Sequence, residues 1–271
     1  MNLIKRFWTA LILLSLVFIV LFYGRAWVVF AFLQLVILGC LIEFYNLARR
    51  RKLHPRTGIG IALALFLGAS FLFKGLPLAL CLFAGLVLIG FDYVVLTRTV
   101  ESAVRVTESI SVTVFGAVYL GLTLNFFLPL REEFGVGFVL FLMAVIFLGD
   151  TGAFFVGKAI GRHRMTPIAS PHKTWEGAVG GLITAGFSAW AAQAVFLPAA
   201  DTLAAVGAGL AVSLVAQVSD PLESLFKRAA GVKDSSNLLP GHGGFLDRVD
   251  SLIFAAPFFY FVLRYLWKPV G

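Results

Sequence analysis

Carboxylates gather in the second half of this 271-residue chain, within or beside long apolar segments. Asp150 follows the apolar run 144–148, and Asp220 ends the segment 213–219. A carboxylate in a membrane helix costs several kcal/mol unless it is paired, hydrated or bound to a cation, so each is a candidate functional residue. Seven of the fourteen acidic residues lie in two such regions: Asp150, Glu176, Asp220, Glu223, Asp234, Asp247 and Asp250.

Two of these carboxylates, Asp247 and Asp250, are placed to bind a metal ion. They are three residues apart at the start of the last apolar segment, so a helix there would put both on one face. Hard oxygen donors without a set of His and Cys ligands favour Mg²⁺ over zinc. The pair is therefore predicted to hold a divalent cation.

Asp220, Glu223 and Lys227 are spaced three and four residues apart. On a helix they share one face, and Glu223 precedes Lys227 in the order that favours an ion pair. Pro221 suits the first turn of a helix, which predicts that the long segment is broken near Asp220. A surface ion pair at a helix end remains the alternative interpretation of this segment.

A glycine-rich loop precedes the last apolar segment. Gly241, Gly243 and Gly244 surround His242. Glycines let the backbone approach a ligand closely or present its N–H groups to phosphate oxygens. The loop is predicted to contact phosphate or substrate, and a purely structural role for His242 stays open.

A second basic segment lies between two apolar stretches. Ser170 and Pro171 predict a turn, after which Lys173 and Thr174 offer donors to phosphate and Glu176 opens the next helix. Basic donors together with metal-binding carboxylates are the parts that phosphoryl or nucleotidyl transfer needs. The small residues of the segment 149–158 are interpreted as sites of close helix packing.

The composition shows which elements must position these groups. The chain is 60% hydrophobic and 13% charged, which no water-soluble domain of this length matches. We expect a single polytopic, all-α integral membrane domain, 1–271, with residues 1–148 mainly spans and 149–271 the catalytic part. About nine transmembrane helices are predicted, the first of them uncleaved, at 7–24, 26–47, 58–73, 76–96, 109–130, 136–148, 177–196, 203–218 and 251–267.

The 22 basic residues predict the orientation. All but Arg25, Lys74, Arg131, Arg264 and Lys268 fall in one set of alternate segments. Cytoplasmic loops carry the excess of Lys and Arg, so the N-terminus is predicted to be cytoplasmic and the polar site to lie at the cytoplasmic side of the C-terminal half. The net charge of +8 does not indicate nucleic-acid binding, because the basic residues lie between apolar segments instead of on one face.

Three ordered blocks resemble a known family. The stretch from Ser224 through Lys227-Arg228 and Lys233-Asp234 to 240–250, Pro-Gly-His-Gly-Gly-Phe-Leu-Asp-Arg-Val-Asp, closely resembles the C-terminal signature of phosphatidate cytidylyltransferases, also called CDP-diacylglycerol synthases. The blocks 150–154 and 170–177 resemble the family's other two recurrent motifs, in the same order and at similar separations. By motif the resemblance covers about 149–251.

The resemblance implies an enzyme of phospholipid biosynthesis. It implies a multi-pass protein of the cell inner membrane, with an active site facing the cytoplasm, that condenses CTP with phosphatidic acid to give CDP-diacylglycerol and pyrophosphate. It also implies Mg²⁺, a monovalent cation such as K⁺ as a second cation, and a homodimer among membrane lipids.

The same resemblance suggests roles for individual residues. The catalytic set is Asp220, Asp247, Lys227, Arg228 and His242. The metal ligands are Asp220 and Asp247, helped by Glu223 and Asp250. The substrate-binding set is Lys173, Thr174, Ser224, Lys233, Asp234, Gly243, Gly244 and Arg248.

Three other classes of membrane protein are weighed against this one. An anion transporter predicts charges near the midplane and inverted halves, and the halves of this chain do not match. A related CTP-dependent lipid or polyprenol phosphotransferase stays open, although the glycine-spaced aspartates of CDP-alcohol transferases are absent. A purely structural subunit would not need so many costly carboxylates.

Overall fold

The computed structural model describes residues 3–73, 75–97, 99–239 and 241–267, and it is mostly helical. Lys74, Arg98, Pro240 and Lys268, which entered the sequence predictions, lie outside the described residues. The elements are α1 (Leu3–Tyr23), α2 (Ala26–Arg50), α3 (Thr57–Leu72), α4 (Leu78–Leu96), α5 (Val100–Val104), α6 (Val106–Gly116), the π-helix η1 (Ala117–Leu122), α7 (Thr123–Asn125), α8 (Phe127–Phe134), α9 (Val136–Ile160), the strands β1 (Arg164–Thr166) and β2 (Ser170–Thr174), α10 (Trp175–Phe196), α11 (Thr202–Ala229), α12 (Leu246–Val249), α13 (Leu252–Phe261) and the π-helix η2 (Val262–Trp267).

Seven helical segments among the described residues are long and apolar enough to cross a membrane by length and composition. Two shorter apolar helices, Leu11–Tyr23 and Thr57–Leu72, accompany them. The prediction of a mostly helical protein with many apolar helices is confirmed. The predicted end of one stretch at Leu148 is wrong, because α9 continues through Asp150 to Ile160 and places that carboxylate inside the helix.

Contacts divide the chain into two compact units. Unit 1 is Met1–Leu128 with Ala229–Arg248, and unit 2 is Pro129–Arg228 with Val249–Gly271. The segment 229–248, which holds the glycine-rich loop, belongs to unit 1 together with the N-terminal helices.

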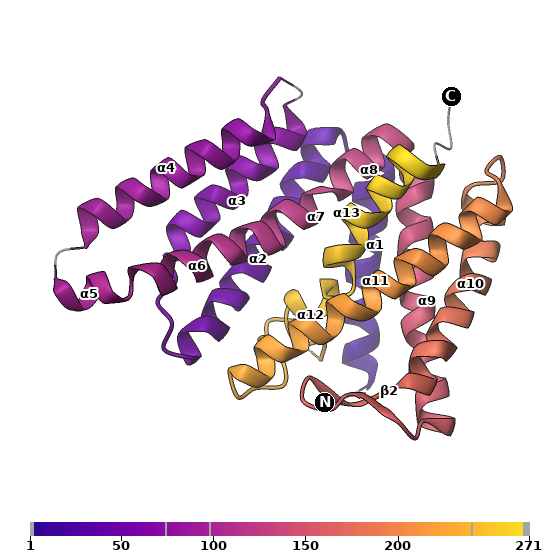
Figure 1. Ribbon diagram of the computed structural model, residues 1–271. Coiled ribbons are helices and arrows are strands. Elements are labelled where there is room, and N and C mark those ends of the chain that lie inside the picture. The colour runs from indigo at the N-terminus through magenta and orange to yellow at the C-terminus, as the bar shows by residue number, and fades with distance from the viewer. Residues whose placement is uncertain (1–2, 74, 98, 240, 268–271) are drawn as a thin grey trace. The chain divides into compact units, whose positions relative to one another are not determined.

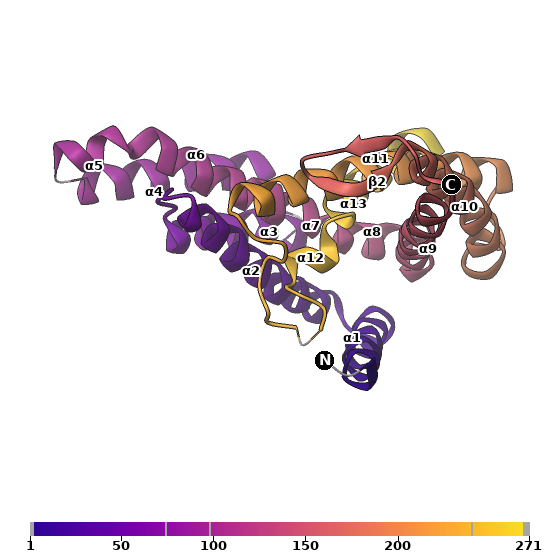
Figure 2. The same ribbon diagram turned by 90° about the horizontal axis from the view of Figure 1, so that it is seen from below.

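In unit 1 the helix α2 packs against α3 and α6, as Figures 1 and 2 show. Tyr45 of α2 is fully buried, and its hydroxyl donates to the carbonyl oxygen of Thr113 at 2.7 Å. Gly60 of α3 and Gly116 of α6 lie directly against the Tyr45 ring, where a methyl group would collide with it. The large ring and the two glycines therefore set how closely these helices approach.

Unit 2 is built on α9, α10 and α11, and Figure 1 shows α9 and α10 side by side. A methyl group at Gly180 of α10 would lie 2.5 Å from Val156 of α9, and one at Gly209 of α11 would collide with Ala189 of α10. Small residues permit this close approach without lipid between the helices. Within 149–158, a methyl group at Gly152 would collide with Thr184 of α10, and one at Gly181 of α10 would lie 2.8 Å from Ala153, so the prediction that small residues in this segment serve packing is confirmed.

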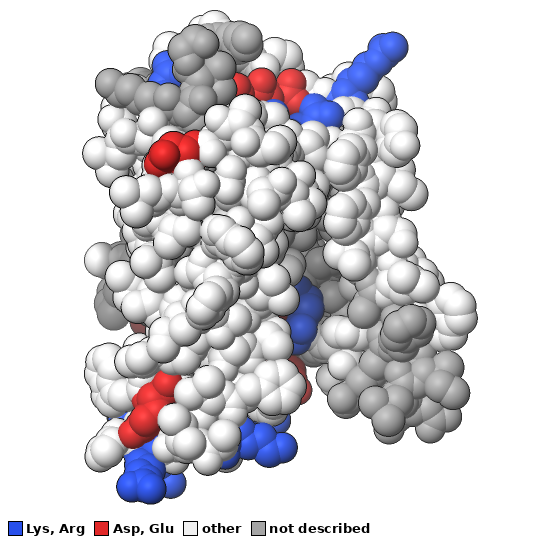
Figure 3. All heavy atoms as spheres, turned by 90° about the vertical axis from the view of Figure 1, so that its right-hand side faces the viewer, with Lys and Arg blue, Asp and Glu red and all other residues white. Residues whose placement is uncertain are grey.

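The outer side of α10 is apolar. Val179, Ile183, Phe187 and Trp190 recur at helical spacing and are each more than half exposed. In Figure 3, uncharged residues cover the middle of this face, and charged ones lie mostly toward its two ends. An exposed apolar band of this kind is solvated by lipid, as expected for a multi-pass membrane protein.

Pro221 does not break α11, contrary to the sequence prediction. The helix runs without interruption from Thr202 to Ala229, with Pro221 inside it and buried. A proline removes the one hydrogen bond that its N–H would make to the residue four positions earlier. Packing along the rest of this 28-residue helix keeps it continuous across the gap.

Candidate active site

Unit 2 gathers three carboxylates from three elements. Asp150 lies on α9, Asp220 on α11 and Asp250 in the turn between α12 and α13, and they lie close enough for their charges to repel one another. Lys173 of β2 pairs with this group, its Nζ lying 2.5 Å from Oδ2 of Asp220. The Ser251 hydroxyl donates to Oδ2 of Asp150 at 3.1 Å. The cluster is therefore an anionic centre on which two lysines act, Lys173 at Asp150 and Asp220 and Lys227 at Asp250.

Glu223 and Lys227 form an ion pair one turn further along α11. Oε2 of Glu223 lies 2.5 Å from Nζ of Lys227, which confirms the pairing predicted from their spacing. The Glu223 side chain is 0% exposed and that of Lys227 10%, so the alternative of a surface pair is wrong. A charge buried in this way must keep its partner, which fixes Lys227 beside the carboxylate cluster.

Asp247 and Asp250 do not share a continuous helix face, contrary to the prediction. The helix α12 ends at Val249, and Asp250 lies in a turn before α13. Oδ1 of Asp250 accepts from the N–H of the next residue, Ser251, at 2.8 Å, a local bond of the kind that competes with helical ones. The carbonyl oxygen of Asp250 accepts from the Ser219 hydroxyl of α11 and so is not available for a helical bond.

A short hairpin carries Lys173 to the cluster. Strands β1 and β2 pair in antiparallel fashion between α9 and α10 (Figure 2). The turn is 167–169, so Ser170 and Pro171 begin the second strand and do not form the turn, as the sequence had predicted. Pro171 is tolerated because a two-stranded hairpin leaves edge N–H groups unpaired.

The hairpin ends in a well-defined helix start. The Thr174 hydroxyl, predicted to face phosphate, accepts from the Gly177 N–H at 3.1 Å as the N-cap of α10. Glu176 lies in the first turn of α10, as predicted, and binds the backbone N–H groups of Arg162 and His163. Arg228 on α11 donates from Nε to the carbonyl oxygen of Ala169 at 3.3 Å.

Unit 1 holds the glycine-rich loop by a buried carboxylate on α2, Glu43, which is 3% exposed. Its Oε1 accepts from the Ser236 hydroxyl at 2.6 Å and the Phe245 N–H at 3.1 Å. Its Oε2 accepts from the Ser235 hydroxyl at 3.0 Å and the Leu246 N–H at 2.8 Å. Sequence reasoning missed this residue, and the signal available was an acidic residue inside an apolar helix.

Asp247 completes the same arrangement. Its Oδ2 accepts from the Ser235 N–H at 2.9 Å, the Ser235 hydroxyl at 2.8 Å and the Gly244 N–H at 2.8 Å. Gly243 has φ of 77° and lies against the Asp247 carboxylate, where a methyl group would be 2.6 Å from Oδ2. These glycines therefore have a structural reason to be small, besides the predicted approach to a ligand.

The remaining predicted residues fall into both units. His242 is half-buried, and its N–H donates to the carbonyl oxygen of Leu239 at 2.9 Å. Lys233, Asp234 and Arg248 are exposed in unit 1, whereas Ser224 is buried on α11 in unit 2. The structure thus brings together Lys173, Asp220, Asp250 and the Glu223–Lys227 pair within unit 2, and Asp247 with the glycines within unit 1.

The carboxylates of unit 2 suit a divalent cation by their chemistry. Hard oxygen donors whose charges repel one another gain from a cation between them, and Mg²⁺ is the ion that such donors favour. Among the described residues, no group of three or more His, Cys, Asp or Glu side chains already has the arrangement of a metal site. Asp220 meanwhile engages Lys173.

Comparison with known proteins gives a family for this arrangement. The chain is 37% identical over 158 residues to the phosphatidate cytidylyltransferase of Bacillus subtilis, which covers 58% of this chain and 59% of the relative. It is 38% identical over 171 residues to the protein of the same name from Staphylococcus aureus, covering 63% and 65%. The matched part thus spans about three-fifths of these relatives. The cytidylyltransferase family matches residues 4–266, nearly the whole sequence, and this chain belongs to that family.

Proposed function

We propose that this protein is a nucleotidyltransferase that condenses CTP with phosphatidic acid to give CDP-diacylglycerol and pyrophosphate. The family match over residues 4–266 carries the proposal, since it includes every predicted site residue. The matched relatives are named phosphatidate cytidylyltransferases. The apolar helices support the membrane setting that a lipid substrate requires.

The proposed reaction exchanges one phosphorus–oxygen bond for another. An oxygen of the phosphatidate phosphate attacks the α-phosphorus of CTP, and the bond to the bridging oxygen of the β-phosphate breaks, so that pyrophosphate leaves with the electron pair. The nucleophile is already an anion, so no strong general base is needed. The chain must instead position the phosphates and neutralise their charge.

The basic residues of unit 2 are suited to that task. Lys173 is held at the end of its strand by Asp220, and Lys227 is held on α11 by Glu223. Each lysine therefore has a fixed position before substrate arrives, which lowers the entropic cost of binding phosphate. Arg228 is anchored by the hairpin carbonyl of Ala169 and supplies a third cation.

Magnesium is part of the proposal. Asp220 and Asp250, helped by Glu223, are the ligands proposed within unit 2. Asp247 of unit 1 is proposed as a ligand from the family resemblance alone, and its Oδ2 already accepts from Ser235 and Gly244. When bound, Mg²⁺ supplies charge neutralisation at the triphosphate. A second cation such as K⁺, and a homodimer, are proposed from the family resemblance.

The loop around His242 is proposed to position one of the phosphates. Glu43 and Asp247 accept from four backbone N–H groups, those of Ser235 and residues 244–246, and from the hydroxyls of Ser236 and Ser235, the latter shared between the two carboxylates. A loop held this firmly can present Gly243, Lys233 and Arg248 in constant positions. The proposed setting is the inner membrane with about nine spans, a cytoplasmic N-terminus and the site on the cytoplasmic side.

A transfer assay tests the reaction. Purified full-length protein in detergent is given phosphatidic acid and CTP labelled at the α-phosphate or, in a parallel sample, at the γ-phosphate, with and without Mg²⁺. We expect α-label in the organic phase as lipid-linked CMP, only with Mg²⁺. In a further sample that contains a polyprenol in place of phosphatidic acid, label transferred from the γ-phosphate to the polyprenol would instead indicate a phosphotransferase. No lipid-linked CMP in any sample would reject the proposed function.

A further inference from the structure

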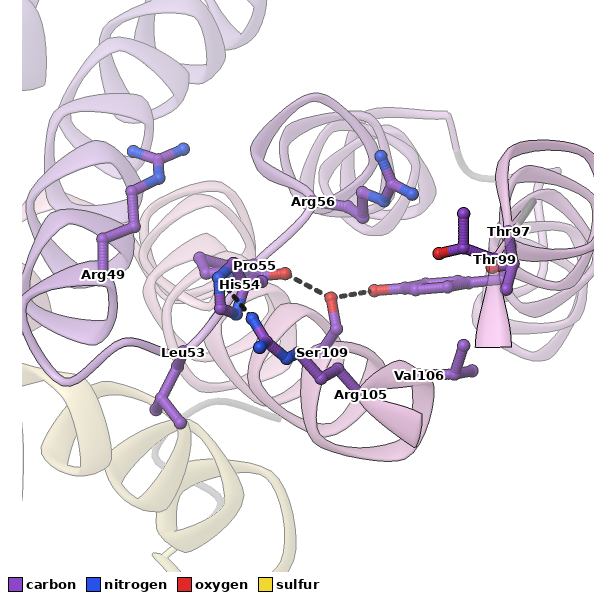
Figure 4. A pocket seen from close by; sticks show the side chains of 11 residues that line it. Arg49, Leu53, His54, Pro55, Arg56, Thr97, Thr99, Arg105, Val106 and Ser109 are labelled. Atoms are coloured by element: carbon purple, nitrogen blue, oxygen red, sulfur yellow. Dashed lines mark hydrogen bonds between the residues drawn. The ribbon is translucent and has the colours of Figure 1, made fainter. Parts of the chain in front are cut away.

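A cavity of about 450 Å³ lies within unit 1, outside all three family blocks. Its basic lining residues come from three elements: Arg49 from α2, Arg56 from the residue before α3, and Arg105 from the residue before α6. Figure 4 shows them arranged around His54 and Ser109. A cavity of this volume is large enough for a ligand of headgroup size.

The described lining of this cavity is basic. Of the described residues that line it, none is Asp or Glu, while three are arginines. Arg56 is partly neutralised from behind, since its Nε lies 3.5 Å from Oδ2 of Asp92 and its guanidinium lies 5.5 Å from the Tyr93 ring centroid. The Arg49 guanidinium donates to the Asn46 side chain and the Thr57 hydroxyl. Arg56 and Arg105 therefore supply most of the positive charge that favours an anion here.

The hydroxyl groups of the wall mainly shape the cavity. The Ser109 hydroxyl donates to the carbonyl oxygen of His54, and the Tyr93 hydroxyl lies 2.5 Å from Oγ of Ser109. Nε2 of His54 is 3.4 Å from an Arg105 nitrogen, which positions that guanidinium. Each guanidinium has five N–H donors in a planar fork, a geometry that matches two phosphate oxygens at once.

The location favours a phosphate carried by a lipid. The helices α2 and α4 end at Arg50 and Leu96, so the cavity lies at one end of apolar helices, where lipid headgroups meet water. Leu53, Pro55 and Val106 add apolar wall beside the arginines. Free inorganic phosphate has no apolar surface to bury against this wall, whereas the glycerol backbone of a lipid gains binding free energy by such burial.

We propose that this cavity binds the phosphate group of an anionic lipid, with Arg56 and Arg105 as its principal contacts. The site uses residues of unit 1 only and shares none with the groups assigned to the transfer reaction. The proposal can therefore be tested by lipid binding alone, whether or not the protein catalyses the proposed reaction. Free inorganic phosphate offers the same recognition chemistry, so the test must separate the two sources.

Arginine labelling gives a readout at single residues. Full-length protein in phosphatidylcholine nanodiscs is treated with phenylglyoxal, and the modification rate of each arginine is measured by peptide mass spectrometry. The other samples contain phosphatidic acid in the bilayer, phosphatidylglycerol in the bilayer, or inorganic phosphate in the buffer. Arg50 and Arg51 are the internal controls, because both are exposed on the same basic segment and neither lines the cavity.

We expect anionic lipid to slow the modification of Arg56 and Arg105 several-fold more than that of Arg50 and Arg51. If the modification of all four arginines slows equally, the negative charge of the bilayer surface explains the slowing, and the proposal is overturned. Protection by inorganic phosphate as strong as that by lipid would overturn the lipid assignment. In Arg105→Gln the protection of Arg56 should be lost, whereas Arg51→Gln should keep it; protection retained in Arg105→Gln would reject the shared site.

Discussion

The carboxylates of the two units have very different surroundings. In unit 1, Glu43 and Asp247 accept from four backbone N–H groups and two serine hydroxyls, one of which they share. In unit 2, Asp150, Asp220 and Asp250 repel one another and have few such donors, with Lys173 as the cation on Asp220. A carboxylate whose acceptor sites are filled holds structure, and one whose charge is only partly balanced is available to a ligand.

The largest loss of activity is expected at Asp220. Its side chain is 22% exposed and pairs with Lys173, which a substrate phosphate could draw away. Asp220→Ala should reduce CDP-diacylglycerol formation by roughly 10³-fold or more, about 4 kcal/mol in transition-state stabilisation, with little change in melting temperature. Turnover by the α-label assay and thermal unfolding in detergent measure the two quantities.

Asp201→Asn is the matched control for that variant. Asp201 precedes the other end of α11, where its Oδ1 accepts from the Ala204 N–H at 2.7 Å, and asparagine can make the same cap. We expect its activity and stability to stay near those of the parent. An Asp220→Ala protein that still turns over at a normal rate would remove the distinction between the two units.

The buried Glu223–Lys227 pair of unit 2 tests how much a carboxylate there depends on a cation instead of on hydrogen-bond donors. Lys227→Met leaves the Glu223 carboxylate, which is 0% exposed, without its lysine, and should destabilise the protein by roughly 3–5 kcal/mol. Adding Glu223→Gln should recover most of that loss, because the uncompensated charge is then removed. Denaturant unfolding of both variants in detergent measures it. If the double variant is no more stable than the single one, the pair acts through packing and not through charge.

A smaller loss is expected for Glu43→Gln in unit 1. The amide nitrogen is a donor that faces either the Phe245 N–H or the Leu246 N–H, so one backbone hydrogen bond is lost, at a cost of roughly 1–3 kcal/mol. The serine hydroxyl on the same side can turn and accept from the amide. Proteolysis within 229–248 should become faster at the same time. Melting curves and limited proteolysis provide the measurements.

Glu133→Gln serves as the comparison for Glu43→Gln. The Glu133 side chain is 41% exposed in its pair with Arg264, so the same substitution should change stability by no more than about 0.5 kcal/mol. Similar melting temperatures for the two variants would show that the filled acceptor sites of Glu43 do not stabilise the loop.

Features that depend on neighbouring residues could be predicted from the sequence, and features that depend on distant residues could not. Apolar stretches gave the helices because a bilayer demands long apolar segments, and the spacing of Glu223 and Lys227 gave their pairing because both lie on one helix. The partners of Glu43 lie at least 192 residues away, so no local pattern shows them. The turn at Asp250 and the continuity of α11 through Pro221 depend in the same way on tertiary contacts.

The smallest expected difference is between two glycine substitutions in the segment 229–248, one of which adds a steric contact to the backbone strain that both cause. Gly243 and Gly231 have φ of 77° and 70°, so alanine at either costs about 1–2 kcal/mol in strain. Only at Gly243 would the new methyl group also meet a carboxylate, that of Asp247, whereas nothing lies within 4 Å of it at Gly231. Gly243→Ala should therefore destabilise the protein more than Gly231→Ala in parallel denaturant titrations. Equal losses would mean that Asp247 moves aside at no cost, and that its bonds from Ser235 and Gly244 do not hold it as Glu43 is held.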